Sequence, residues 1–164
     1  MESTAHPHST RRDAPGQAPD DGPQVRTLEF TRTAFQVLGL SAPQAAQAAA
    51  EGGAVLNGSL VCVAPLAIGS LTGKTADDIY MVTVETRRRV EELNTTQVAT
   101  MLAHGPGLLA VHRATLGCLP DGRIVLHRTV DAASATPQDL ANAMHAAQQL
   151  VQLLWGDGRA PQRQ

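Results

Sequence analysis

The sequence predicts an α+β domain in which helices pack against an antiparallel sheet. Helix-spaced apolar residues occur near the start, in the middle and at the end of the chain, and segments typical of strands lie between them. Two turn signals, Asn57-Gly58 and Pro120-Asp121-Gly122, each separate two apolar segments and therefore predict hairpins. The expected order of elements is α(α)βββαββα, with the antiparallel sheet sandwiched with helices.

The domain is expected to span residues 25–157 of the 164-residue chain. Residues 1–24 contain four prolines and no large apolar residue after Met1, so they bury too little surface to offset the entropy of ordering. We therefore predict a disordered N-terminal tail over residues 1–24 and a short C-terminal tail over residues 158–164.

The first helix is predicted from Val25 to Leu40, and its apolar residues form two strips. One strip comprises Val25, Leu28, Phe35 and Leu38, and the other comprises Phe30, Ala34 and Val37. A helix packed on one core rarely needs two strips, so this helix has more apolar surface than packing requires. A short second helix is predicted from Ser41 to Glu51, closed by Gly52-Gly53.

The strand segments show two kinds of pattern. Residues 54–68 are apolar on both faces and predict a short arm and a longer strand ending near Pro65, joined at Asn57-Gly58. Residues 79–86 alternate, which is typical of a strand with one buried face. In that strand Ile79, Met81, Thr83 and Glu85 share one face, and Tyr80, Val82, Val84 and Thr86 share the other.

Two further helices complete the prediction. The middle helix follows the three arginines 87–89 and is expected to stop near His104-Gly105-Pro106-Gly107, after which residues 108–119 and 123–130 form a hairpin. The last helix is expected to begin with Thr136 as its cap, Pro137 in the first turn and Asp139 near the positive end of the dipole, and to end near Trp155.

Composition excludes several classes of partner. Aromatic residues make up 2 % of the chain, which argues against a protein that stacks single-stranded bases. The net charge of −2 provides no basic field for nucleic acid or an anionic membrane. Cys62 and Cys118 lie in apolar stretches and are expected to be buried free thiols. With no apolar run long enough to span a membrane and no signal-like start, we expect a cytoplasmic protein.

No residue cluster carries a convincing catalytic signal. The segment Gly69–Thr75 resembles a phosphate-binding loop, but it is one residue short and precedes a predicted strand rather than a helix. The six histidines are scattered, and the adjacent carboxylates Asp77-Asp78 and Glu91-Glu92 point apart. We therefore expect no enzymatic activity, no cofactor and no metal, and a small nucleotide-binding enzyme is the weakest alternative.

The chain resembles the class I type III secretion chaperones (CesT/SycE-like), which hold bacterial effector proteins before export. The resemblance covers residues 25–155 and rests on the first helix ending Val37-Leu38-Gly39-Leu40, the apolar strand region and the middle helix. It also rests on the hairpin from Leu116 to Leu126 and on Trp155 near the end of the last helix. The resemblance implies a homodimer without nucleotide or metal, whose apolar patches bind the extended N-terminal segment of an effector.

The candidate partner contacts lie on the first helix and on the strand after Asn57-Gly58. We expect an extended effector segment to bury side chains there and to add main-chain hydrogen bonds at a sheet edge. The contact residues would be Phe30, Ala34, Val37, Leu60, Cys62 and Ala64. The ATPase of the export apparatus is a further expected partner.

Two other interpretations stay open. The apolar surplus is also consistent with a well-buried sheet or a homodimer interface. The protein is alternatively a secreted substrate or structural component of such an export system, with residues 1–24 as its export signal. Deletion of residues 1–24 separates a chaperone, which would still bind its client, from a substrate, which would stay in the cytoplasm.

Overall fold

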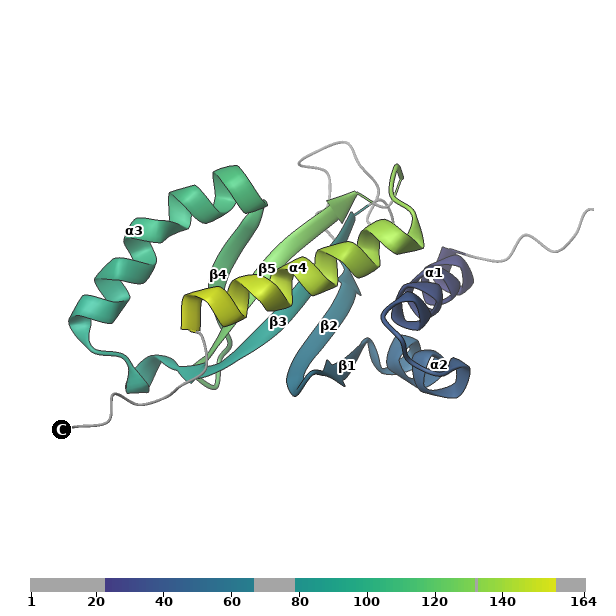
Figure 1. Cartoon of the computed structure of the whole chain (residues 1–164), viewed down its shortest axis with the longest axis horizontal. Helices are drawn as coiled ribbons and strands as arrows, with labels where there is room; N and C mark the ends of the chain where they lie inside the picture. The colour runs from purple at the N-terminus through teal and green to yellow at the C-terminus, as the bar shows by residue number, and fades with distance from the viewer. Residues whose placement is uncertain (1–22, 67–78, 132, 156–164) are drawn as a thin grey trace, which may run out of the picture.

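Four helices and a five-stranded antiparallel sheet make up the described part of the chain (Figure 1). The computed structural model describes residues 23–66, 79–131 and 133–155. The α+β class and the order α(α)βββαββα are thereby confirmed. The elements are α1 (Pro23–Val37), α2 (Ala42–Glu51), β1 (Gly53–Leu56), β2 (Ser59–Pro65), β3 (Ile79–Arg89), the single 3-10 turn η2 (Val90–Glu92), α3 (Thr95–His112), β4 (Ala114–Cys118), β5 (Arg123–Asp131) and α4 (Pro137–Trp155).

The strands lie side by side in the order β1-β2-β3-β5-β4. Both predicted hairpins form: Leu56 opposes Ser59 across Asn57-Gly58, and Cys118 opposes Ile124 across the second turn. The ladder between β3 and β5 shifts register between Glu85 and Arg89, where Arg87 adopts a φ of 59°. A bulge of this kind adds a local twist, and β3 passes from it directly into η2.

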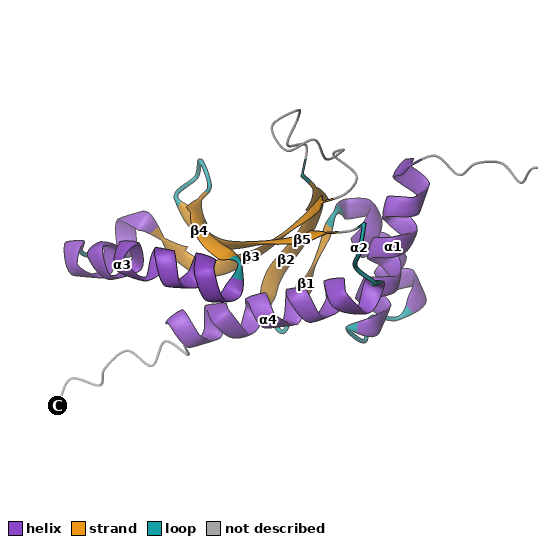
Figure 2. Cartoon of the chain, turned by 90° about the horizontal axis from the view of Figure 1, so that it is seen from above, coloured by secondary structure: helices purple, strands orange, loops and turns teal. Residues whose placement is uncertain are grey.

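The core lies between one face of the sheet and α4, which packs against β3 and β5 (Figure 2). Strand β3 buries Tyr80, Val82, Val84 and Thr86, so the alternation predicted for it is confirmed. Helix α4 buries a stripe at helical spacing that includes Leu140, Met144, Ala147 and Val151. Each large apolar side chain removed from water in this layer stabilises the fold by roughly 1.5–3 kcal/mol.

The buried and exposed residues of helix α1 do not follow the two predicted strips. Thr31, Ala34 and Phe35 are buried, whereas Leu28 and Val37, one from each strip, are exposed. The helix packs mainly on α2 and α4, and its buried Phe35 and Ala34 come one from each strip. It begins at Pro23, two residues before the predicted domain boundary, and the tails over 1–22 and 158–164 lie outside the described residues.

The predicted end of the middle helix near Gly105-Pro106-Gly107 is wrong, because α3 continues to His112. A proline inside a helix removes one backbone hydrogen bond and costs about 3 kcal/mol, which alone favours a stop. Burial of one side chain and a cap at the helix end favour the longer helix. Leu108 is buried, and the backbone N–H of Arg113, in the left-handed conformation, caps the carbonyls of Leu108 and Leu109. Residues 108–112, expected to be a strand, are therefore helical.

Candidate functional site

One face of the sheet points away from α4, and we call it the open face. Because side chains alternate along a strand, the neighbours of buried Val61 and Val63 on β2 must point to this face. The ladders align Cys62 with Thr83 and Ala64 with Met81, and then Thr83 with His127. The open face thus carries Leu60, Cys62 and Ala64 from β2, Ile79, Met81, Thr83 and Glu85 from β3, and Val125, His127 and Thr129 from β5.

The half of the open face formed by β1, β2 and the start of β3 is apolar. Val55 on β1 is 68 % exposed, and Ala64 is exposed as well. Leu60, Cys62 and Met81 are half-buried, so each still presents part of its side chain to solvent. Contiguous exposed apolar surface of this kind marks protein-binding sites.

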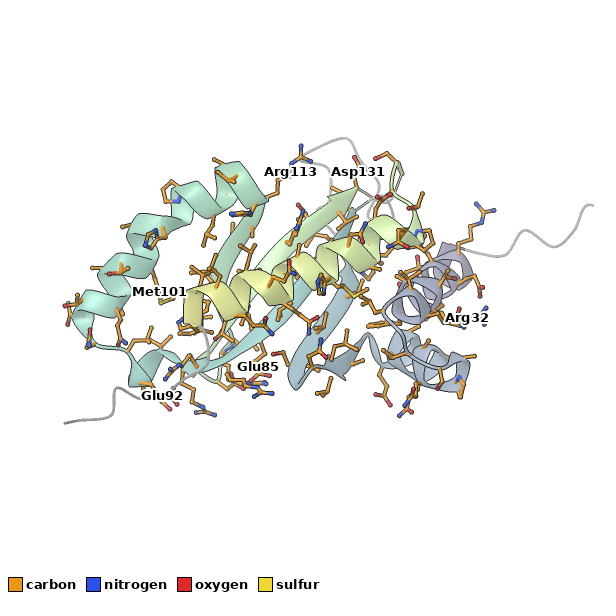
Figure 3. All side chains as sticks on the ribbon, viewed as in Figure 1. Arg32, Glu85, Glu92, Met101, Arg113 and Asp131 are labelled. Atoms are coloured by element: carbon orange, nitrogen blue, oxygen red, sulfur yellow. The ribbon has the colours of Figure 1, made fainter. Side chains whose placement is uncertain are left out.

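Apart from Val125, which is 1 % exposed, the other half of the open face is polar and internally paired. Thr83 Oγ1 and His127 Nδ1 are 3.0 Å apart, within hydrogen-bonding distance. The Arg123 guanidinium bridges Glu85 at 3.3 Å and Asp121 at 2.6 Å (Glu85 is labelled in Figure 3). Backbone and side-chain hydrogen bonds from Arg123 lower the pKa of Asp121. The charged side chains of Glu85, Arg123 and Asp121 are therefore paired with one another and lie beside the apolar half.

The two cysteines are free thiols, but their burial differs from the prediction. Cys118 is exposed, whereas Cys62 is half-buried on the open face. Burial raises the pKa of the Cys62 thiol, and the nearby Glu85 carboxylate raises it further. A thiol held in its protonated form is a poor nucleophile, so Cys62 contributes apolar surface rather than reactivity.

The six predicted contact residues do not form one continuous surface. Leu60, Cys62 and Ala64 share the open face as predicted. Phe30 instead stacks on Tyr80, with ring centroids 5.5 Å apart, and Tyr80 belongs to the covered face of the sheet. The α1 residues therefore lie on the opposite side of the sheet from the β2 residues.

Within α1 the exposure of the predicted contacts differs strongly. Ala34 has no exposed surface and is a core residue, which corrects its prediction as a contact. Val37 is 43 % exposed and remains available to a partner. Val55 and Met81 also lie on the open face but were not among the predicted contacts, although the alternation in β3 places Met81 on the same face as Thr83.

The loop Gly69–Thr75 and the pair Asp77-Asp78 lie outside the described residues. Across residues 23–66, 79–131 and 133–155, no three His, Cys, Asp or Glu side chains gather in a way that could hold a metal ion. In the same ranges, no helix combines the length and apolarity needed to cross a membrane.

The comparisons with known proteins identify a fold. No protein-family model and no curated protein matches the sequence. The fold resembles that of a chain in the crystal structure of the ExsC–ExsE complex. The TM-score is 0.57, and the match covers 81 % of this chain and 92 % of that chain. At 11 % sequence identity, this likeness shows a shared fold and nothing finer.

Proposed function

We propose that this protein is a cytoplasmic type III secretion chaperone that binds the extended N-terminal segment of an effector and keeps it competent for export. The observation that carries this proposal is the open face, where β1, β2 and β3 present apolar side chains on the side of the sheet away from α4. The proposed role is binding without catalysis, and the paired polar groups of Glu85, Arg123 and Asp121 border the site.

The edge strand β1 provides the main-chain part of the proposed site. The Val63 N–H donates to the Gly52 carbonyl at 2.8 Å, so Gly52 and Val63 form a hydrogen-bonded pair of the ladder between β1 and β2. Alternation in an antiparallel pair then directs the N–H and C=O of Gly53 and Val55 away from β2. An extended segment can pair with these groups and become a sixth strand.

A groove beside β1 can receive the side chains of such a strand. It has a volume of about 490 Å³ and lies between the turn after α1 and the middle of α4. Its walls combine apolar Leu38, Leu40 and Val55 with polar Gln44, His145 and Gln148. Alternate side chains of an added strand would enter this groove, and the others would lie beside Val55 on the open face.

The fold comparison supports a binding role. The similar chain was crystallised in a complex of two named proteins, ExsC and ExsE. A client that orders itself on binding gives up conformational entropy, so we expect modest affinity for the area buried. The homodimer and the contact with the export ATPase that the family resemblance implies are part of the same proposal.

The test is a quantitative pull-down from the native organism, followed by mass spectrometry and by calorimetry. Wild type is compared with Leu60→Asp and Ala64→Asp, which place a charge in the apolar half of the open face. Ala64 is exposed, so this variant is expected to fold normally. A client should be recovered with wild type and lost with both variants, and its N-terminal segment, made as a peptide, should bind wild type but neither of these two variants.

Two further variants sharpen the result. Val55→Pro removes an N–H that points away from β2, so it should abolish peptide binding while leaving the sheet intact. Ala46→Asp, on the exposed side of α2, is the matched control and should bind like wild type. If Ala64→Asp and Val55→Pro both retain the peptide, or if the client binds through a folded domain, the proposed function is wrong.

A further inference from the structure

The groove beside β1 differs from the open face because polar side chains form much of its wall. Of the described residues that line it, none is Asp, Glu, Lys or Arg. Its polar members are Gln44, Asn57, His145 and Gln148, which come from α2, the hairpin turn and α4. Figure 1 shows α1, α2 and β1 together at one end of the molecule. A groove of this composition suits an uncharged side chain that forms hydrogen bonds, because a buried charge needs a partner of opposite sign.

Gln148 presents a hydrogen-bond acceptor to this groove. Its Nε2 donates to the Leu56 carbonyl, which fixes the orientation of the carboxamide, and no described residue donates to its Oε1. Across the described residues, Arg32 Nε is the one side-chain nitrogen or oxygen atom that is both fully buried and without a partner. Gln148 Oε1 therefore reaches accessible space, although the residue is only 6 % exposed. Because Gln148 lines the groove, this oxygen faces into it.

Gln44 and His145 present donors to the same groove. The Ser41 N–H and hydroxyl donate to Gln44 Oε1 at 3.1 and 2.8 Å, so the other end of this carboxamide is the Nε2 donor, from which no described residue accepts. Gln149 Nε2 lies 3.0 Å from His145 Nε2. An amide nitrogen can only donate, so His145 Nε2 accepts and the neutral ring carries its proton on Nδ1. The groove wall thus offers donors at Gln44 and His145 and an acceptor at Gln148.

A strand added to β1 would direct one side chain into this groove. The client residue opposite Val55 lies on the open face, and side chains alternate, so the next client residue, beside Leu56, points to the other side of the sheet. Leu56 and Asn57 form part of the groove wall there. Because neighbouring strands lie about 4.8 Å apart, this side chain must be long to reach α2 and α4. The occupant is therefore a long side chain at one defined position of the client.

Four kinds of long side chain can be compared by their hydrogen-bonding groups. A carboxylate accepts from Gln44 and His145 but has no hydrogen to donate to Gln148 Oε1. An ammonium group donates to that oxygen but meets the other two groups as a third donor. An apolar side chain removes Gln148 Oε1 from water and leaves it without a partner, which weakens binding. A carboxamide has an oxygen for the two donors and an NH₂ group for the acceptor, so it alone matches all three.

We infer that the groove beside β1 selects a glutamine side chain of the client, at the position that lies beside Leu56. The carboxamide oxygen of this glutamine accepts from Gln44 Nε2 and His145 Nδ1, and its NH₂ group donates to Gln148 Oε1. Gln44 and His145 are thereby specificity-determining residues. The inference rests on the proposed function and adds to it a chemical requirement on the client sequence, which the open face alone does not impose.

The first experiment selects short peptides from a phage-displayed library on the purified full chain. The bound sequences should share one glutamine. In the tightest peptide, replacing that glutamine by Leu, Glu or Lys should weaken binding about tenfold in calorimetry, because hydrogen-bonding groups in the groove lose their partners. Selected peptides without a shared glutamine, or equal affinities for the Gln and Leu peptides, overturn the inference and leave the proposed function standing. A chain that selects no peptide at all contradicts both.

The second experiment exchanges the groove's donor for an acceptor. Gln44→Glu keeps an oxygen for Ser41, so the start of α2 stays capped, but the second carboxylate oxygen replaces the Nε2 donor. This variant should bind the Gln peptide about tenfold more weakly than wild type does and the Lys peptide more tightly. Gln152→Glu is the matched control, because it adds the same charge at an exposed position of α4 outside the groove, and it should keep the wild-type order of peptides. If Gln44→Glu also keeps that order, the inference is wrong.

Discussion

Gln148, in the middle of α4, donates a hydrogen bond from Nε2 to the backbone carbonyl of Leu56, 2.7 Å away at the end of β1. Both groups are buried, and the bond joins the last helix to the edge strand. We predict that Gln148→Leu destabilises the protein by about 1 kcal/mol, because the buried hydrogen bond between α4 and β1 is lost. Urea unfolding followed by circular dichroism measures this loss.

The control for Gln148→Leu is Gln152→Leu, which changes an exposed glutamine one turn further along α4. A surface substitution of this kind should alter the free energy of unfolding by no more than about 0.5 kcal/mol. Equal losses for the two variants would show that the buried hydrogen bond contributes nothing specific.

The stacking of Phe30 on Tyr80 predicts a structural role for Phe30. The rings are nearly parallel, with an interplanar angle of 11°, and the Tyr80 hydroxyl donates to Thr27 Oγ1 at 3.1 Å. Phe30→Ala should lower the free energy of unfolding by about 2–3 kcal/mol, through lost burial and the lost aromatic pair. Peptide binding per folded molecule should stay unchanged, and calorimetry on the folded fraction measures it. Loss of peptide binding without loss of stability would show instead that Phe30 contacts the client.

His127 should make stability depend on pH. Burial lowers its pKa below the ordinary value of 6.5, so the folded state binds this proton less readily than the unfolded state does. The contribution of neutral His127 is therefore complete above about pH 6.5 and is lost as the pH falls through the folded-state pKa. His127→Gln should show a smaller loss of stability over this range in urea titrations at successive pH values. Identical pH profiles for the two proteins would contradict the expectation.

The parts of the fold that the sequence predicted well are those set by local chemistry. Alternation in β3 separated the buried Tyr80, Val82 and Val84 from the open face without any knowledge of the partner strands. The Asn57-Gly58 pair predicted its hairpin because both residues adopt positive φ, 50° and 76° in the structure. In each case neighbouring residues alone determine the backbone.

The misplaced features depend mainly on which side chains the folded core buries. The end of α3 is decided by burial of Leu108 and by the Arg113 cap, which outweigh the local effect of Pro106. In the candidate site, helical periodicity identified two strips on α1 but could not show which residues the core takes. Phe30 meets Tyr80, 50 positions later in the chain, and Ala34 is enclosed completely. The β2 half of the site was predictable because a strand has just two faces.

The Thr136 cap at the start of α4 affects the pKa of Asp139. The Thr136 N–H donates to Asp139 Oδ2 at 2.8 Å, and the Asp139 N–H donates to Thr136 Oγ1 at 3.2 Å. Hydrogen bonds from the Thr136 side chain and backbone lower the pKa of Asp139, so its stabilising contribution is present above the ordinary value of 3.8 and is lost as the pH falls through the folded-state pKa.

Thr136→Ala removes the hydroxyl, which donates to Asp139 Oδ2 at 2.7 Å and accepts from the Asp139 N–H, and it keeps the backbone N–H. It should destabilise the protein by about 1 kcal/mol and raise the pKa of Asp139, because the side-chain hydrogen bond that contributes most to its lowering is lost. A carboxyl-detected NMR titration of Asp139 in both proteins measures the shift, and thermal unfolding measures the stability. Ser134→Ala, which alters a nearby exposed hydroxyl outside the cap, should leave the Asp139 pKa in place. If Thr136→Ala also leaves that pKa in place, the carboxylate is held by the helix dipole instead of by the threonine.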